Sequence, residues 1–157
     1  MGKYFLESSA FVKRYKQEKG SHFINRLFKE GHQLFYLNLA IIEIRKVFYR
    51  LYKWPFPAEK NFSITRKEFE KLNACLAADL LKMYRIDFTQ EMIEKATEIL
   101  EKVWIKSVFD LAHLSSFLIA KDIYPDLIFV CSDKRSNLIK AAEIFVNSLD
   151  IRIPENE

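Results

Sequence analysis

The stretch "YFLESSAFVKRY", residues 4–15, begins as a short apolar run and changes character at Glu7. Successive apolar residues without polar alternation are typical of a strand buried on both faces. Glu is a poor helix N-cap compared with Ser, Thr, Asp or Asn. Either Ser8 or Ser9 therefore caps the helix that follows and Glu7 has no role, or Glu7 points at a ligand.

The same continuous apolar pattern predicts two more buried strands, at residues 34–37 and 127–131, and weaker strands at 85–88 and 150–153. Helical periodicity lies between them and predicts helices over 10–16, 22–29, 40–52, 68–84, 90–104, 107–121 and 136–146. Two prolines in residues 54–62 predict a loop. Strands that alternate with helices indicate an α/β fold, with a central parallel β-sheet flanked by helices on both faces.

The composition indicates one domain over residues 1–157, because half of the chain is hydrophobic and 14 residues are Phe. No apolar run approaches the roughly 20 residues that span a bilayer, and the N-terminus lacks a signal-peptide core. We therefore expect a cytoplasmic protein without a membrane segment. Cys75 and Cys131 match no metal or redox spacing and are predicted to be core residues. The net charge of +4 permits a nucleic-acid partner, but a solvated Lys/Glu-rich surface explains it equally well.

Acidic residues follow the predicted strands or open the predicted helices. In an open parallel sheet, sites form at the carboxyl ends of the strands, where Glu7 and Asp133 both fall. Asp133 also fits a turn or an N-cap. Asp110 lies near the start of the most apolar helix, where a carboxylate needs a partner or a metal, although a structural ion pair would suffice. Glu43 lies at the border of an apolar helix face near Arg50, and a solvated or salt-bridged glutamate is the alternative there.

Together, these four acids indicate a divalent metal site, because carboxylates suit Mg²⁺ or Mn²⁺ and would repel one another without a cation. No histidine is needed in such a site, and His113 is predicted to bond Asp110, one helical turn earlier. The three glycines form no phosphate-binding loop, which argues against a P-loop or Rossmann nucleotide site.

With these acids in this order, the chain resembles the PIN-domain family, and within it the VapC-type toxins. Four stretches carry the resemblance: "YFLESSAFVKRY" (4–15), "LFYLNLAIIEIRKVFYR" (34–50), "VFDLAHLSSFLIAK" (108–121) and "FVCSDKRSNLIKAAE" (129–143). The resemblance implies a PIN-like fold and metal-dependent cleavage of RNA. It also implies a homodimer and an antitoxin protein whose tail crosses the site.

Carried over by position, the resemblance implies catalytic and metal-binding roles for Glu7, Glu43, Asp110 and Asp133, with Ser8 beside them. The chain departs from the family at Glu7, where the family nearly always has Asp, so either the metal shifts or the longer side chain folds back. Residues 53–66 look like a local elaboration that changes substrate or antitoxin contacts. The candidates for RNA binding are basic residues close to the motifs, each of which could also be an ordinary solvated side chain: Lys13, Arg14, Arg45, Lys134 and Arg135.

The leading hypothesis is therefore a Mg²⁺- or Mn²⁺-dependent endoribonuclease, the toxin of a toxin–antitoxin pair. The departure at Glu7 favours an alternative, a catalytically weakened PIN-like scaffold that binds RNA or a protein partner. A third alternative is an unrelated α/β domain in which the acids are coincidental.

Overall fold

The computed structural model describes residues 1–132 and 137–157, and its centre is an all-parallel five-stranded sheet. The strand order is β3-β2-β1-β4-β5. The strands are β1 (Lys3–Leu6), β2 (Gln33–Leu37), β3 (Tyr84–Ile86), β4 (Leu127–Val130) and β5 (Ile151–Arg152). In the register, Phe5 of β1 lies between Phe35 of β2 and Phe129 of β4. The α/β fold predicted from the sequence is confirmed.

Helices connect the strands. They are α1 (Ser8–Phe11), α2 (Ser21–Lys29), α3 (Ala40–Lys53), α4 (Arg66–Leu80), α5 (Gln90–Leu100), α6 (Val108–Ile123) and α7 (Leu138–Phe145). None of the helices in the described residues is both long and apolar enough to cross a membrane.

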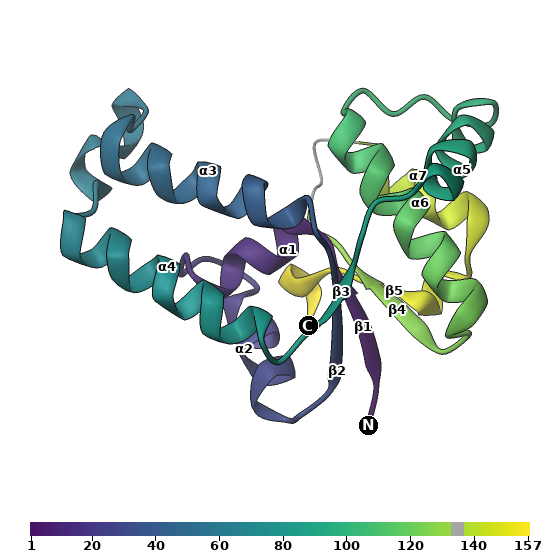
Figure 1. Cartoon of the computed structure of the whole chain (residues 1–157), viewed down its shortest axis with the longest axis horizontal. Helices are drawn as coiled ribbons and strands as arrows, with labels where there is room; N and C mark the ends of the chain where they lie inside the picture. The colour runs from purple at the N-terminus through teal and green to yellow at the C-terminus, as the bar shows by residue number, and fades with distance from the viewer. Residues whose placement is uncertain (133–136) are drawn as a thin grey trace.

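The sheet separates two hydrophobic cores, with α1–α4 on one face and α5–α7 on the other (Figure 1). Successive residues of β1 supply both cores, because side chains alternate along a strand: Phe5 packs with α6, whereas Leu6 packs with α1 and α3. This arrangement explains why β1, β2 and β4 are continuously apolar in sequence.

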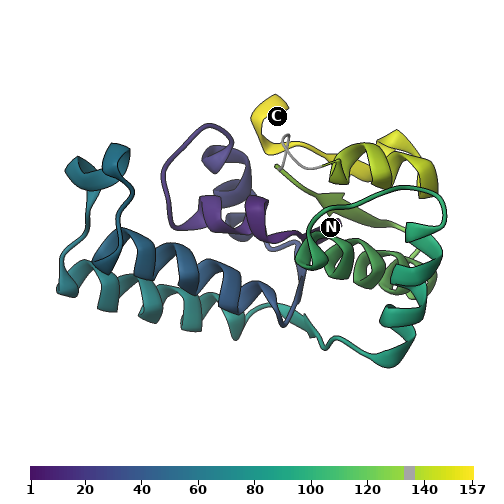
Figure 2. The same ribbon diagram turned by 90° about the horizontal axis from the view of Figure 1, so that it is seen from above.

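Helices α3 and α4 lie side by side and extend together beyond the sheet, which both views show (Figures 1 and 2). A 3-10 helix, Pro57–Phe62, lies in their connection at the far end of this extension. The segment 53–66, which the sequence marks as an elaboration, therefore forms the tip of a helical arm.

Several element boundaries differ from the sequence prediction. The helix predicted over 68–84 ends at Leu80, and Tyr84 already belongs to β3. The helix predicted over 10–16 begins earlier, at Ser8, and gives way to a 3-10 helix, Val12–Arg14. The loop predicted at 54–62 contains the 3-10 helix at the arm's tip.

Of the two cysteines, Cys131 is buried as predicted, but Cys75 is exposed, so the prediction of a core position was wrong there. Cys75 lies on α4, whose outer side faces solvent where the arm leaves the sheet.

Candidate metal centre

Glu7 follows β1 directly and is itself the N-cap of α1. Its carboxylate is almost fully buried and accepts three hydrogen bonds. The Ser8 hydroxyl donates to Oε1 at 2.7 Å, and the Ser9 N–H donates to Oε2 at 2.9 Å. The Ser9 hydroxyl also donates to Oε2. The longer side chain thus folds back onto its own helix, although glutamate is a rare N-cap.

Ser9 links Glu7 to the end of β4. Its hydroxyl oxygen accepts the Ser132 N–H at 3.0 Å while donating to Glu7. Two neighbouring strands, β1 and β4, therefore hold one carboxylate at the carboxyl edge of the sheet. Sequence reasoning assigned the supporting role to Ser8 alone, and Ser9 adds a second hydroxyl to it.

Glu43 lies in the first turn of α3, which starts soon after β2 ends. Its Oε2 lies 2.6 Å from Nε2 of His113, a hydrogen bond between residues 70 positions apart. The sequence placed Glu43 near Arg50, but Arg50 instead pairs with Glu59 at 3.0 Å.

Helix α6 supplies Asp110 and His113. Ser107 is the N-cap of α6, and its hydroxyl accepts the Asp110 N–H at 3.3 Å. Because α6 runs back across the sheet and ends just before β4, its first turn lies at the carboxyl edge of the strands. Both Asp110 and His113 are buried.

The sequence predicted that His113 bonds Asp110. This was wrong, because the Nε2 atom of His113 pairs with Glu43 instead. Its other ring nitrogen, Nδ1, is buried and has no hydrogen-bond partner among the described residues. The only sequence signal for His113 was its place one turn after Asp110, which cannot indicate a contact with α3.

Glu7, Glu43 and His113 form a group that could hold a metal ion. One donor atom from each lies within 4.8 Å of the others. Two carboxylates and an imidazole are ligands that divalent transition metals accept, and few protein carboxylates are enough for Mg²⁺. The two carboxylates fit a divalent cation such as Mg²⁺ or Mn²⁺, while His113 is hydrogen-bonded to one of them.

The pKa of His113 reflects the negative charges around it. Burial alone lowers the pKa of His113, but its hydrogen bond to Glu43 and the negative charges of Glu7, Glu43 and Asp110 outweigh burial, so the pKa is raised overall. The imidazole thus responds to an excess of negative charge in the pocket, which a bound cation would also offset.

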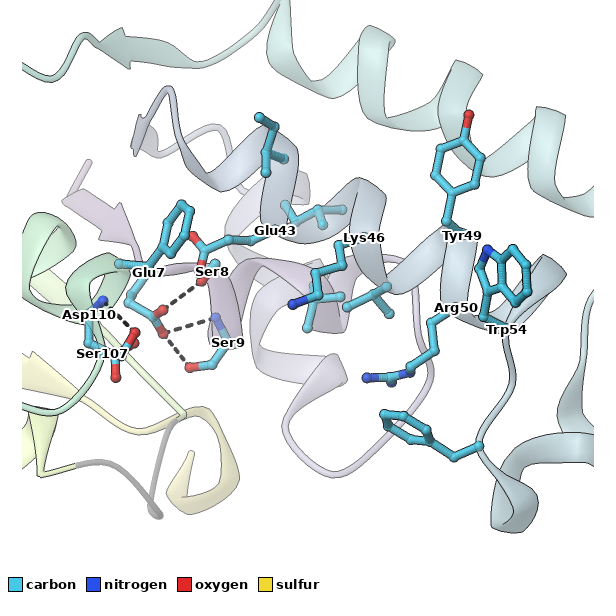
Figure 3. Close-up of a pocket in the computed structure, with 16 residues that line it drawn as sticks. Glu7, Ser8, Ser9, Glu43, Lys46, Tyr49, Arg50, Trp54, Ser107 and Asp110 are labelled. Carbon is cyan, nitrogen blue, oxygen red and sulfur yellow. Dashed lines mark hydrogen bonds between the residues drawn. The ribbon is translucent and has the colours of Figure 1, made fainter.

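A groove of about 690 Å³ opens from this centre and runs along α3 (Figure 3). Glu7, Glu43 and Asp110 lie at one end and Trp54 at the other, with Lys46 between them. Three of the four acids predicted from the sequence therefore line one groove. The fourth, Asp133, lies outside the described residues.

The basic residues proposed for RNA have different surroundings. Lys13 is buried, where its Nζ pairs with Glu18 at 2.7 Å and with Glu155 at 3.2 Å. Arg14 pairs with Asp79 at 3.0 Å. Both side chains are thus occupied within the protein.

Of the remaining basic candidates, only Arg45 lies in the described residues. Arg45 is exposed on α3 and is not among the groove's lining residues. Lys134 and Arg135 lie outside the described residues. The cations that do line the groove are Lys46 and Arg50, which share a face of α3 with Glu43 at helical spacing, whereas the adjacent Arg45 does not.

No family model and no curated relative matches this sequence. Solved structures do match. A chain of the DNA-bound VapBC complex from Salmonella typhimurium is 12% identical, with a TM-score of 0.61, and the match covers 98% of this chain and 99% of that one. The chain has a PIN-like α/β fold.

Two further structures share this fold. A chain of VapBC2 from Rickettsia felis, bound to a promoter DNA fragment, is 17% identical with a TM-score of 0.56 over 84% of this chain and 88% of that one. PAE2754 from Pyrobaculum aerophilum is 15% identical with a TM-score of 0.55 over 89% of this chain and 79% of that one. At these identities the comparisons establish the fold and leave the activity to the chemistry of the site.

Proposed function

We propose that this protein is a metal-dependent endoribonuclease and the toxin of a toxin–antitoxin pair. The observation that carries the proposal is the convergence of Glu7, Glu43 and His113 within 4.8 Å, with Asp110 lining the same groove. The fold shared with chains of VapBC complexes supports the toxin assignment.

In this proposal Glu7, Glu43, Asp110 and Asp133 hold Mg²⁺ or Mn²⁺. The cation would neutralise developing charge on the phosphate and activate the attacking water. Ser8 and Ser9 orient the Glu7 carboxylate by their hydrogen bonds, and His113 orients Glu43. The groove would position the RNA backbone next to the acids.

Cleavage of a mixed RNA pool tests this function. The parent should cut in Mg²⁺ or Mn²⁺ and stop in EDTA. Glu43→Gln should lose most activity, because a neutral amide is a poor ligand for a hard cation. Glu94→Gln is the matched control, since Glu94 is an exposed acid on α5 outside the groove. Cleavage that persists in EDTA would contradict the metal mechanism.

The toxin role and the partners need separate tests. Expression of the parent should arrest growth of a bacterial host, whereas Glu43→Gln should not. Co-expression with a small protein from the adjacent reading frame should restore growth and yield a stable complex. The proposed homodimer is checked by light scattering of the purified chain, and a monomer at all concentrations would contradict it.

One observation favours the second candidate function, a weakened scaffold that binds RNA or a protein. Both oxygens of Glu7 already accept hydrogen bonds from Ser8 and Ser9. A carboxylate has about four acceptor positions, so three hydrogen bonds leave little capacity for a metal. A parent that binds RNA but cuts none in either metal would support the scaffold.

A further inference from the structure

The groove ends in two exposed aromatic residues at the start of the arm's tip. Trp54 is the C-cap of α3, and Phe56 precedes the 3-10 helix, Pro57–Phe62. Trp54 is 73% exposed and Phe56 is 57% exposed, although both line the groove. Single exposed aromatic residues are common, but two that line the same groove form an apolar patch, which is typical of a binding surface.

Two cations lie between these aromatic residues and the acids. Lys46 has no ion-pair partner among the described residues. The guanidinium of Arg50 lies 4.9 Å from the ring centroid of Phe56, and its Nη2 pairs with Glu59 at 3.0 Å, so Arg50 ties the arm's tip to α3. Figure 3 shows Lys46 and Arg50 projecting into the space between Glu43 and Trp54.

This order of side chains matches the chemistry of an unpaired nucleic-acid strand. Exposed aromatic rings stack on bases, and cations beside them contact successive phosphates. A polypeptide could also cover the apolar walls, but it would not need the cation Lys46 between the rings and the acids. The groove is also continuous with the carboxylates that would hold the metal for cleavage.

We propose that Trp54 is a base-stacking platform for a nucleic-acid strand in the groove, with Lys46 as a phosphate contact. The proposal rests on the proposed nuclease function and assigns the residues that hold its substrate. A base held at Trp54 would align the connected phosphates along α3 toward Glu7 and Glu43.

Binding is measured on the full chain in EDTA, so that no cleavage occurs. The probe is a short fluorescein-labelled oligouridylate, followed by anisotropy. Trp54→Ala should weaken binding by about tenfold, the size expected for the loss of one stacked base. Trp54→Phe should recover most of the affinity, because Phe keeps a stacking ring.

The chain contains two tryptophans, which supplies a matched control. Trp104 is 75% exposed but does not line the groove. Trp104→Ala should bind the oligouridylate like the parent. In a Trp104→Phe background, oligouridylate should quench the fluorescence that remains at Trp54, and an abasic ribose-phosphate oligomer of the same length should not.

Equal binding of the abasic oligomer and the oligouridylate would overturn the proposal, since it would mean that phosphates alone are recognised. Parent-like binding by Trp54→Ala would overturn it as well. If the parent does not bind oligouridylate, the proposal is also overturned, and a polypeptide becomes the expected occupant of the groove.

These results separate the proposal from the nuclease function. If the parent cuts RNA but Trp54→Ala cuts and binds equally well, the stacking platform fails and the nuclease stands. If oligouridylate quenches Trp54 but no metal supports cleavage, the nuclease fails and the binding groove stands.

Discussion

Glu7 joins a structural role and a chemical one in a single carboxylate. It caps α1 through the Ser9 N–H and lies within reach of Glu43 and His113. The extra methylene relative to Asp lets the side chain fold back to its own helix. The carboxylate can therefore stay beside the pocket although the side chain is longer than that of Asp.

Exchange of Glu7 tests this view. If the enzyme is adapted to the longer carboxylate, Glu7→Asp should keep cleavage within about tenfold of the parent, a barrier change of roughly 1.4 kcal/mol. Glu7→Gln should lose far more activity. Both variants should stay folded, since Asp is a good N-cap and Gln keeps an acceptor oxygen.

The measurement is cleavage of a mixed RNA pool in Mg²⁺ or Mn²⁺ with an EDTA control. An inactive parent that gains activity on Glu7→Asp would identify a lapsed nuclease instead. RNA binding that is unchanged in both variants, without cleavage in any, would identify a scaffold.

His113 is the residue whose position most changes the interpretation of the site. It is completely buried, and its Nε2 fixes Glu43 at 2.6 Å. Residues that orient metal ligands through hydrogen bonds strongly affect metal affinity. His113 therefore acts on the centre through Glu43.

We expect His113→Leu to weaken Mn²⁺ binding by about 10- to 100-fold, because Glu43 loses its orienting donor. His113→Gln, which keeps an N–H donor, should weaken it less. Calorimetric titration of the purified variants with Mn²⁺ measures the affinity, and circular dichroism confirms folding. Equal affinity for the parent and His113→Leu would remove His113 from the site.

At the scale of elements, one polar contact ties α4 to the first helices. Asp79 of α4 is buried and accepts hydrogen bonds from Arg14 Nε and from the Tyr15 hydroxyl, both at 3.0 Å. This contact anchors the sheet end of the arm that carries Trp54 at its other end. The packing of α4 against the first helices thus depends on a cluster remote from the acids.

The anchor has a measurable pH signature. Burial and the charge of Asp79 raise the pKa of Tyr15 well above its ordinary value of 10.0. The protonated phenol is favoured in the folded state, so its contribution to stability is complete below pH 10 and is lost as the pH rises above it.

Tyr15→Phe should therefore make stability less sensitive to alkaline pH. Above pH 10, the parent's free energy of unfolding should fall more steeply than the variant's, by up to about 1.4 kcal/mol per pH unit. Urea unfolding at several alkaline pH values measures both slopes. Tyr84→Phe, at a half-exposed position, is the control, and identical slopes for the parent and Tyr15→Phe would contradict the prediction.

At the scale of the whole molecule, the fold concentrates negative charge where its layers meet. Glu7, Glu43 and Asp110 come from both faces of the sheet, from α1, α3 and α6. Their mutual repulsion opposes folding unless protons or a cation offset it. Metal binding should therefore stabilise the entire domain.

Mn²⁺ at neutral pH should raise the melting temperature. Saturation at a hundred times the dissociation constant contributes about 2.7 kcal/mol, or roughly 5–10 °C for a domain of this size. Asp110→Asn should abolish most of the rise, and the surface variant Glu94→Gln should keep it. Differential scanning calorimetry measures the shift, and an unchanged parent would mean that the pocket binds no metal usefully.

The sequence by itself determined the layers of the fold. Continuous apolar runs at β1, β2 and β4 predicted strands covered on both faces, because only such strands need apolar side chains on successive positions. It also placed Glu7, Glu43 and Asp110 at strand ends and helix starts, where topology alone brings them to one edge.

Only the tertiary structure decided which side chains meet. The pairing of Glu43 with His113 joins α3 to α6 across the sheet, and no local pattern encodes a contact between residues 70 positions apart. Tyr84 was assigned to a helix because β3 is a short, largely exposed edge strand that lacks the buried pattern. Cys75 and Trp54 are exposed because the arm extends beyond the sheet. Burial depends on what packs against a helix, and the helix's own sequence does not specify that.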